Sequence, residues 1–198
     1  MYSSAFGLWV RTKSGKQRPL MIIGRDARIS GPMVRDLVAA SLNGMGIDVL
    51  DLGLSTTPTV EMMVAIENAD GGIIITASHN PVQWNALKLL NSEGEFINAE
   101  EGAQVLQLAE KGDLEFAAVN ELGNTSPLEG TIERHIDKIL KLDLVDVEAI
   151  RSKNYKVVCD CVNSTGGIAV PMLLKALGVE QVIELYCEPN GQFPHDPE

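Results

Sequence analysis

Aromatic residues and cations are both scarce in this sequence of 198 residues, and each shortage excludes a class of protein. Aromatic side chains make up 5% of the chain, too few for an all-β sandwich stabilised by aromatic cross-strand pairs. The 16 Lys and Arg residues are outnumbered by 27 Asp and Glu residues, which gives a formal net charge of -11. Nonspecific nucleic-acid binding needs clustered cations that displace counterions, so we expect no nucleic-acid partner.

Cysteine is rare as well, and long apolar runs are missing. Cys159, Cys161 and Cys187 form an odd set without the spacing of a disulfide framework. Cys159 and Cys161 are expected to be core thiols of one strand, because no second Cys/His pair lies nearby to complete a zinc site. Residues 1–10 lack a signal-peptide pattern, and no apolar run reaches the roughly 18 residues of a membrane span. These features favour a cytoplasmic protein without a membrane partner.

What the chain does have is an alternation of short apolar runs with longer segments of helical period, which is typical of βαβ units on a mainly parallel sheet. Strands are predicted at residues 19–24, 47–53 and 71–76. Helices are predicted to begin at the N-caps Ser30, Thr57 and Asn98, and a further helix is expected over 132–140. A long polar loop is expected between the third strand and residue 93, holding Trp84, Asn85 and Lys88.

The same pattern restarts after a charged segment at 141–154, and a domain boundary is expected near residues 142–154. A strand at 155–160, a helix at 165–177 and a second strand at 181–186 are predicted there. A unit this short cannot complete an α/β sheet alone. We therefore predict an α/β fold: a three-layer α/β/α domain with a mainly parallel mixed sheet at 1–145, followed at 146–198 by the start of a second similar domain.

Polar residues follow the carboxyl ends of the predicted strands, which is where open parallel sheets bind ligands. Ser78 leaves the third strand at such an end. His79 and Asn80 beside it can donate hydrogen bonds, and Lys88 follows within reach across a loop. This composition indicates a site for a dianionic group.

Other enzyme classes lack their motifs. A serine hydrolase would hold its nucleophile in a Gly-x-Ser-x-Gly elbow, whereas Ser78 is flanked by Ala77 and His79. His79 is also a poor general base for Ser78, because adjacent side chains point apart on most backbones. Neither a Gly-x-x-x-x-Gly-Lys-Ser/Thr loop nor a Gly-x-Gly-x-x-Gly fingerprint is present.

The string Thr76-Ala77-Ser78-His79-Asn80-Pro81 resembles the active-site signature of the α-D-phosphohexomutases, the family of phosphoglucomutase, phosphomannomutase and phosphoglucosamine mutase. The resemblance extends over nearly the whole chain. Further segments similar to family motifs are Gly24–Arg28, Gly53 with Thr57-Pro58, Trp84–Lys88, Val158–Gly167 and Glu188–Pro194.

This resemblance implies an isomerase that moves a phosphoryl group between the 1 and 6 positions of a hexose phosphate. Phosphorylated Ser78 would give its phosphoryl group to a sugar monophosphate, and the bisphosphosugar formed would return its other phosphate. Lys88 would assist proton movement at the sugar hydroxyl, and His79 would hydrogen-bond substrate or phosphate. Substrate binding is assigned to Asn80, Arg25 and Arg28. The two arginines, with Asp26 beside them, also fit a structural ion-pair cluster at a strand end.

The resemblance further implies Mg²⁺, bound through the phosphate on Ser78, and a hexose 1,6-bisphosphate as activator. A phosphoserine carries about -1.5 to -2 charge, and Mg²⁺ binds phosphate oxygens together with a few carboxylates. The family's aspartate-rich metal loop is absent, as is an early Ser/Thr-Gly-x-Arg-Gly motif with a catalytic arginine. We therefore expect an N-terminal fragment that is inactive, or nearly so, on its own.

The expected substrate is glucosamine phosphate first, then mannose or glucose phosphate, handled by a monomer or a homodimer. Two alternatives stay open. One is a non-catalytic sugar-phosphate-binding or regulatory module of the same fold, and the other is a scaffold domain, which would expose a large apolar patch. The combination of Ser78, His79 and Lys88 argues against both, because neither needs it.

Overall fold

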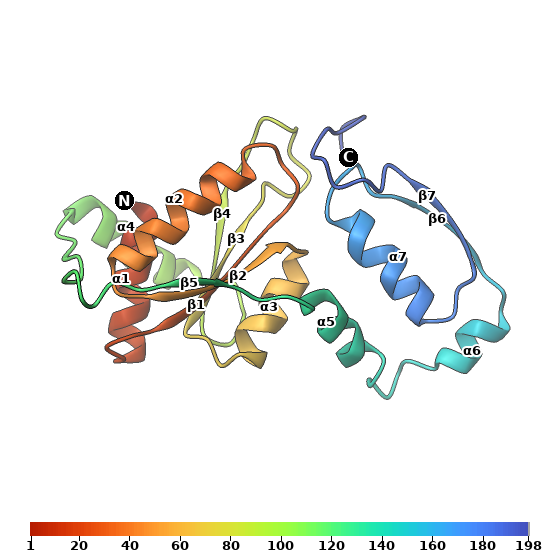
Figure 1. Cartoon of the computed structure of the whole chain (residues 1–198), viewed down its shortest axis with the longest axis horizontal. Helices are drawn as coiled ribbons and strands as arrows, with labels where there is room; N and C mark the ends of the chain where they lie inside the picture. Colours follow the sequence, from red (N-terminus) through yellow and green to blue (C-terminus); the bar gives the residue numbers. More distant parts are fainter. Residues whose placement is uncertain (198) are drawn as a thin grey trace.

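The computed structural model describes residues 1–197, arranged as a larger unit that contains a five-stranded sheet and a smaller unit with two strands (Figure 1). The helices are α1 Tyr2–Ser14, α2 Gly31–Gly44, α3 Thr57–Ile66, α4 Ala99–Lys111, α5 Thr131–Ile139, α6 Val147–Ser152 and α7 Gly166–Ala176. The strands are β1 Leu20–Arg25, β2 Asp48–Leu54, β3 Gly71–Ile75, β4 Leu87–Leu90, β5 Thr125–Pro127, β6 Lys156–Asp160 and β7 Gln181–Leu185.

The large sheet has the strand order β4-β3-β1-β2-β5, and its layers confirm the predicted α/β class. Strands β1, β2, β3 and β5 pair in parallel, whereas β4 runs antiparallel to β3. One apolar cluster joins one face of the sheet to α1, α2 and α4, and a second joins the other face to α3. The sheet is therefore mixed, mainly parallel and covered on both sides.

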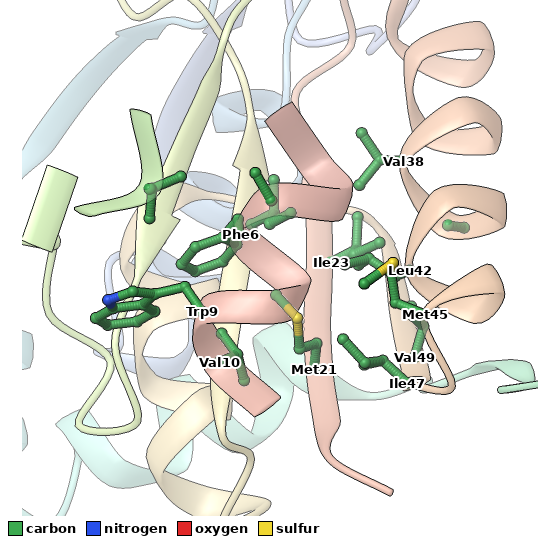
Figure 2. Close-up of a cluster of buried hydrophobic side chains, with 14 of the residues drawn as sticks. Phe6, Trp9, Val10, Met21, Ile23, Val38, Leu42, Met45, Ile47 and Val49 are labelled. Carbon is green, nitrogen blue, oxygen red and sulfur yellow. The ribbon is translucent and has the colours of Figure 1, made fainter. Parts of the chain in front are cut away.

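The main core lies under α1 and α2 (Figure 2). Phe6 and Val10 of α1 are at most 1% exposed, as are Met21 and Ile23 of β1 and Leu42 of α2. Each fully buried side chain of this size contributes about 1.5–3 kcal/mol relative to an exposed one. Since strands β1 and β3 are buried on both faces, their carboxyl ends are fixed by the core beneath them.

The three predicted N-caps have different outcomes. Asn98 is the N-cap of α4 as predicted and forms a capping box with Glu101. Ser30 occupies the N-cap of α2 as predicted, but its hydroxyl makes no capping hydrogen bond and accepts instead from the Asn85 side chain. The N-cap of α3 is Thr56 and not Thr57, because the Thr56 hydroxyl accepts the hydrogen bond from the Thr59 N–H.

Four elements were not predicted from the sequence: α1, β4, β5 and α6. β4 corrects the predicted long polar loop, because it places Lys88 on a strand, opposite Ile74 of β3. β5 consists of three exposed residues at the sheet edge, where a proline such as Pro127 is tolerated. β4, β5 and α6 are short and contain few apolar residues in a regular pattern.

The smaller unit consists of the parallel pair β6 and β7 with α7 beside it, as predicted. Val158, Ile183 and Leu185 on its other side are 60%, 57% and 42% exposed; we call these three residues the open face. α5 contacts both α3 and α7, and the predicted domain division after residue 145 stays a prediction. No helix within residues 1–197 is long and apolar enough to cross a membrane.

Candidate active site around Ser78

Ser78 lies just beyond the carboxyl end of β3, exposed and in a left-handed backbone conformation with a φ of 54°. Two hydrogen bonds fix this turn: the Ser78 N–H donates to Thr76 Oγ1 over 3.2 Å, and the Thr76 hydroxyl donates to Asp26 Oδ2 over 2.7 Å. The left-handed conformation costs a non-glycine residue roughly 1–2 kcal/mol. Such a cost persists only where the surroundings over-determine the backbone, so the position of Ser78 is imposed by the structure around it.

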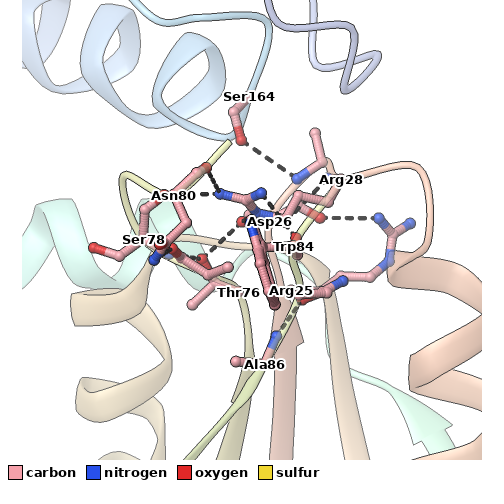
Figure 3. A network of polar contacts seen from close by, with 12 residues as sticks. Arg25, Asp26, Arg28, Thr76, Ser78, Asn80, Trp84, Ala86 and Ser164 are labelled. Carbon is pink, nitrogen blue, oxygen red and sulfur yellow. Dashed lines mark hydrogen bonds and ion pairs between the residues drawn. The ribbon is translucent and has the colours of Figure 1, made fainter. Parts of the chain in front are cut away.

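Arg28 is the residue that imposes most of this order (Figure 3). Its side chain is fully buried, and all five of its N–H donors are used. Nε donates to Asp26 Oδ2 over 3.0 Å. The two terminal nitrogens donate over 2.7 to 2.9 Å to four backbone carbonyls of the loop, those of Ser78, Asn80, Pro81 and Trp84.

Asp26 completes this clamp between β1 and β3. Its carboxylate accepts from the Thr76 hydroxyl and from both the backbone N–H and Nε of Arg28. With every donor engaged inside the protein, Arg28 has none to offer a ligand. The geometry therefore favours the structural interpretation of Arg28 over the substrate-binding role assigned to it.

Arg25 lies apart from the serine. Its guanidinium donates to the Asp26 carbonyl over 3.1 Å and lies on the α2 side of the loop (Figure 3), with its Cδ close to Gly31 at the start of α2. Burial lowers the pKa of Arg25, partly offset by the charge of Asp51. The structure thus places Arg25 beside a helix start and does not bring it together with Ser78.

Ser78 and Lys88 line the same cleft, which has a volume of about 210 Å³. Asn80, Trp84 and Asn85 also line it. Lys88 Nζ lies 5.7 Å from the centroid of the Phe96 ring. The cleft brings the predicted phosphate carrier and the predicted lysine to one place, although β4 and not a loop supplies the lysine.

The two residues after Ser78 have different surroundings. The Asn80 side-chain amide donates to the Ala77 carbonyl over 2.7 Å, which tightens the turn itself. His79 Nδ1 is 3.5 Å from Ser78 Oγ, a separation too long for a strong hydrogen bond. The geometry therefore does not make His79 a general base for Ser78, in agreement with the argument from sequence.

The smaller unit reaches this network through two loops that sequence reasoning did not connect to it. Ser164 Oγ accepts from the Ala27 N–H over 3.4 Å, and the Phe193 ring lies over the Arg28 guanidinium at 5.1 Å. Gly191 has a φ of 74°, and a Cβ there would lie 1.9 Å from the Ala27 carbonyl oxygen. Only glycine allows this approach. Close packing of this kind leaves no periodic signal in a sequence.

The Ser78 loop offers little for the Mg²⁺ implied by the resemblance. Asp26 is the carboxylate of the loop network, and its oxygens already bind Arg28 and Thr76. Within the described part of the chain, a phosphate on Ser78 would thus be the one ligand that this loop supplies. That agrees with metal ligands lying elsewhere, and the magnesium itself stays a prediction.

Two family models match the chain. The phosphoglucomutase/phosphomannomutase α/β/α domain I matches residues 2–116, and domain II of the same family matches residues 133–198. A phosphoglucomutase/phosphomannomutase of Thermococcus kodakarensis is 39% identical over 96% of this chain and 41% of its own length. A probable phosphoglucosamine mutase of Methanopyrus kandleri is 36% identical over 89% of the chain and 38% of its own length.

Solved structures agree. A phosphoglucomutase/phosphomannomutase family protein from Burkholderia thailandensis superposes with a TM-score of 0.79 at 26% identity, over 98% of this chain and 41% of its own. A putative phosphomannomutase from Thermus thermophilus has a TM-score of 0.81 at 24% identity, over 97% of this chain and 42% of its own. The chain spans about 40% of the length of these relatives. It belongs to the phosphoglucomutase/phosphomannomutase family, with domains I and II both represented.

Proposed function

We propose that this chain is the phosphoryl-carrying part of a hexose-phosphate mutase and that Ser78 is the residue phosphorylated. The observation that carries the proposal is the exposed Ser78 at the carboxyl end of β3, on a loop clamped by Arg28 through four carbonyls. Phosphoryl transfer is catalysed mostly by positioning and charge stabilisation. A rigid loop that presents one hydroxyl to solvent meets the first of these needs.

The proposed transfer has two halves. In the first, a hydroxyl of the sugar monophosphate attacks the phosphorus of phospho-Ser78, the bond from phosphorus to Ser78 Oγ breaks, and the hydroxyl proton is released. In the second, Ser78 Oγ attacks the phosphorus of the other phosphate of the bisphosphosugar, the bond from that phosphorus to the sugar oxygen breaks, and this oxygen takes up the proton. The proton given up in one half is thus returned in the other.

Lys88 is proposed to move that proton. It lines the cleft of Ser78, and β4 holds it opposite Ile74 of the central strand β3. Its ammonium group also supplies positive charge beside a dianion in a chain whose net charge is -11. We assign hydrogen bonding to the substrate or phosphate to His79 and Asn80, which flank the transferred group. When bound, Mg²⁺ would neutralise charge on the phosphate oxygens.

The proposed substrate is a hexose phosphate, with glucosamine phosphate preferred over mannose or glucose phosphate, and a hexose 1,6-bisphosphate is the proposed activator. Several relatives carry the name probable phosphoglucosamine mutase, including those of Methanopyrus kandleri and Methanosphaera stadtmanae. These names support the ranking.

The test is a mass-spectrometric map of the full-length product of the gene, after incubation with a hexose 1,6-bisphosphate and Mg²⁺. We expect phosphate on Ser78 and none on Ser92, an exposed serine of a neighbouring turn. Ser78→Ala should abolish both the phosphate and mutase activity, and Ser92→Ala should change neither. An unmodified Ser78 in a folded, metal-loaded protein would contradict the mutase proposal and favour the non-catalytic sugar-phosphate-binding module.

A further inference from the structure

The three cysteines of the chain meet in the smaller unit, although Cys187 lies 26 residues after Cys161 in the sequence. Their sulfur atoms all lie within 4.8 Å of one another. Cys159 is the buried residue near the end of β6, Cys161 lies in the turn after β6, and Cys187 follows β7. The parallel pairing sets this meeting, because the Cys161 N–H donates to the Leu185 carbonyl over 3.0 Å, two residues before Cys187. We call these three residues the thiol cluster.

Helix α7 begins directly against the thiol cluster with two glycines. A Cβ on Gly166 would lie 3.6 Å from the Cys161 sulfur, and one on Gly167 would lie 2.1 Å from the Cys187 carbonyl oxygen. The start of α7 therefore packs against the Cys161 sulfur and the backbone of Cys187.

The cluster is enclosed on one side and open on another. Cys159 and Cys161 are buried, at 8% and 6% exposure, whereas Cys187 is half-buried. Burial raises the pKa of Cys161 to about 12 and also raises that of Cys187. An ion would reach the cluster past Cys187, the most exposed of the three cysteines.

We propose that the thiol cluster is a binding site for a soft metal ion, monovalent copper, independent of the chemistry at Ser78. Three sulfurs at about 2.3 Å from a central ion lie roughly 4 Å apart, and those of the cluster need shift only slightly to reach this spacing. Structural zinc takes four protein ligands, and among the described residues the cluster offers three. Thiolates are ligands of Cu(I), of zinc and of iron–sulfur clusters, and iron–sulfur clusters, like structural zinc, take four protein ligands. Cu(I) therefore fits the three sulfurs best, and binding converts each ligating thiol to a thiolate with release of its proton.

The experiment titrates the reduced, oxygen-free chain with Cu(I) against a coloured Cu(I) chelator. We expect one ion per chain, an ultraviolet thiolate-to-copper absorption, and release of protons on binding. Cys187→Ser, at the half-buried position, should fold as the parent does by circular dichroism and bind copper at least about 100-fold more weakly. Met172→Leu removes a sulfur outside the cluster and should bind as the parent does.

Each opposite result overturns the proposal. A parent chain that yields all its copper to the chelator without a stoichiometric step has no such site. Equal affinity in the folded Cys187→Ser variant would move binding away from the thiol cluster. Retention of Zn²⁺ against a chelator under conditions that strip Cu(I) would overturn the assignment to copper.

Discussion

Replacement of Arg28 by alanine is the sharpest test of how the Ser78 loop is held. The substitution deletes five hydrogen bonds at once: one to Asp26 and four to backbone carbonyls of the loop. It also leaves Asp26, which is 8% exposed, without its only ion-pair partner among the described residues. The change should therefore damage both global stability and the local order around Ser78.

The size of the effect follows from burial. Removal of one member of a buried ion pair costs about 3–5 kcal/mol, because the other charge stays buried without compensation. The four carbonyls add less than four full hydrogen bonds, since residues 78–80 are exposed and water can replace the guanidinium there. We expect Arg28→Ala to lower the free energy of unfolding by about 3–5 kcal/mol. Arg28→Lys should recover part of this, because an ammonium offers three donors where Asp26 and the loop together use five.

Denaturant unfolding measures the stability loss, and limited proteolysis of residues 78–86 measures the order of the loop. Arg25→Ala is the matched control, since this neighbouring arginine is partly exposed and makes one hydrogen bond to the Asp26 carbonyl. It should cost about 1 kcal/mol or less and leave cleavage unchanged. A loss below about 1 kcal/mol for Arg28→Ala, with an equally protected loop, would refute the clamp.

Three further predictions concern other parts of the chain. Ser78→Gly should be about 1 kcal/mol more stable than Ser78→Ala by denaturation, because glycine tolerates a φ of 54°; equal stabilities would contradict the imposed backbone. The Asp196 carbonyl and the Asp160 carboxylate raise the pKa of His195. The stabilising contact between His195 and Asp160 is therefore complete below a pH of about 6.5 and is lost as the pH rises through the raised pKa. Asp160→Asn should lower the pKa of His195 measured by NMR, and an unchanged titration would contradict the ion pair. Ile183→Lys on the open face should reduce the fluorescence of a bound hydrophobic dye, and undiminished fluorescence would place the apolar patch elsewhere.

The frame of the fold was predictable because its central strands are buried on both faces. Residues 20–24 and 71–75 form consecutive apolar runs, and such runs indicate burial. Polar residues begin where these strands leave the core, which is why Ser78 could be placed at the carboxyl edge. Edge strands carry no such record. Leu87–Leu90 contains a lysine within a polar segment, and Thr125–Pro127 is exposed throughout.

The supporting network of the site was not predictable, and the reason lies in the kind of group that Arg28 binds. Four of its five acceptors are backbone carbonyls, which every residue possesses, so the residue types of the loop say nothing about them. The sequence motif showed an arginine next to an aspartate at a strand end and left open whether it faces ligand or protein. Only the fold decides this, by turning the loop after β3 back over the end of β1.

Arg28 also links the two units of the chain. Carbonyls of the Ser78 loop accept hydrogen bonds from the Arg28 guanidinium. The Phe193 ring of the smaller unit lies against the same guanidinium at 5.1 Å, a separation typical of a cation–π contact. In the proposed reaction the bisphosphosugar has to present each of its phosphates to Ser78 in turn, so the sugar moves while the serine must not. A loop locked by backbone hydrogen bonds on one side and packed against the second unit on the other satisfies that requirement. For the same reason Arg28 is better used to fix the loop than to bind the sugar, because its donors are all held by Asp26 and the loop carbonyls while the sugar turns.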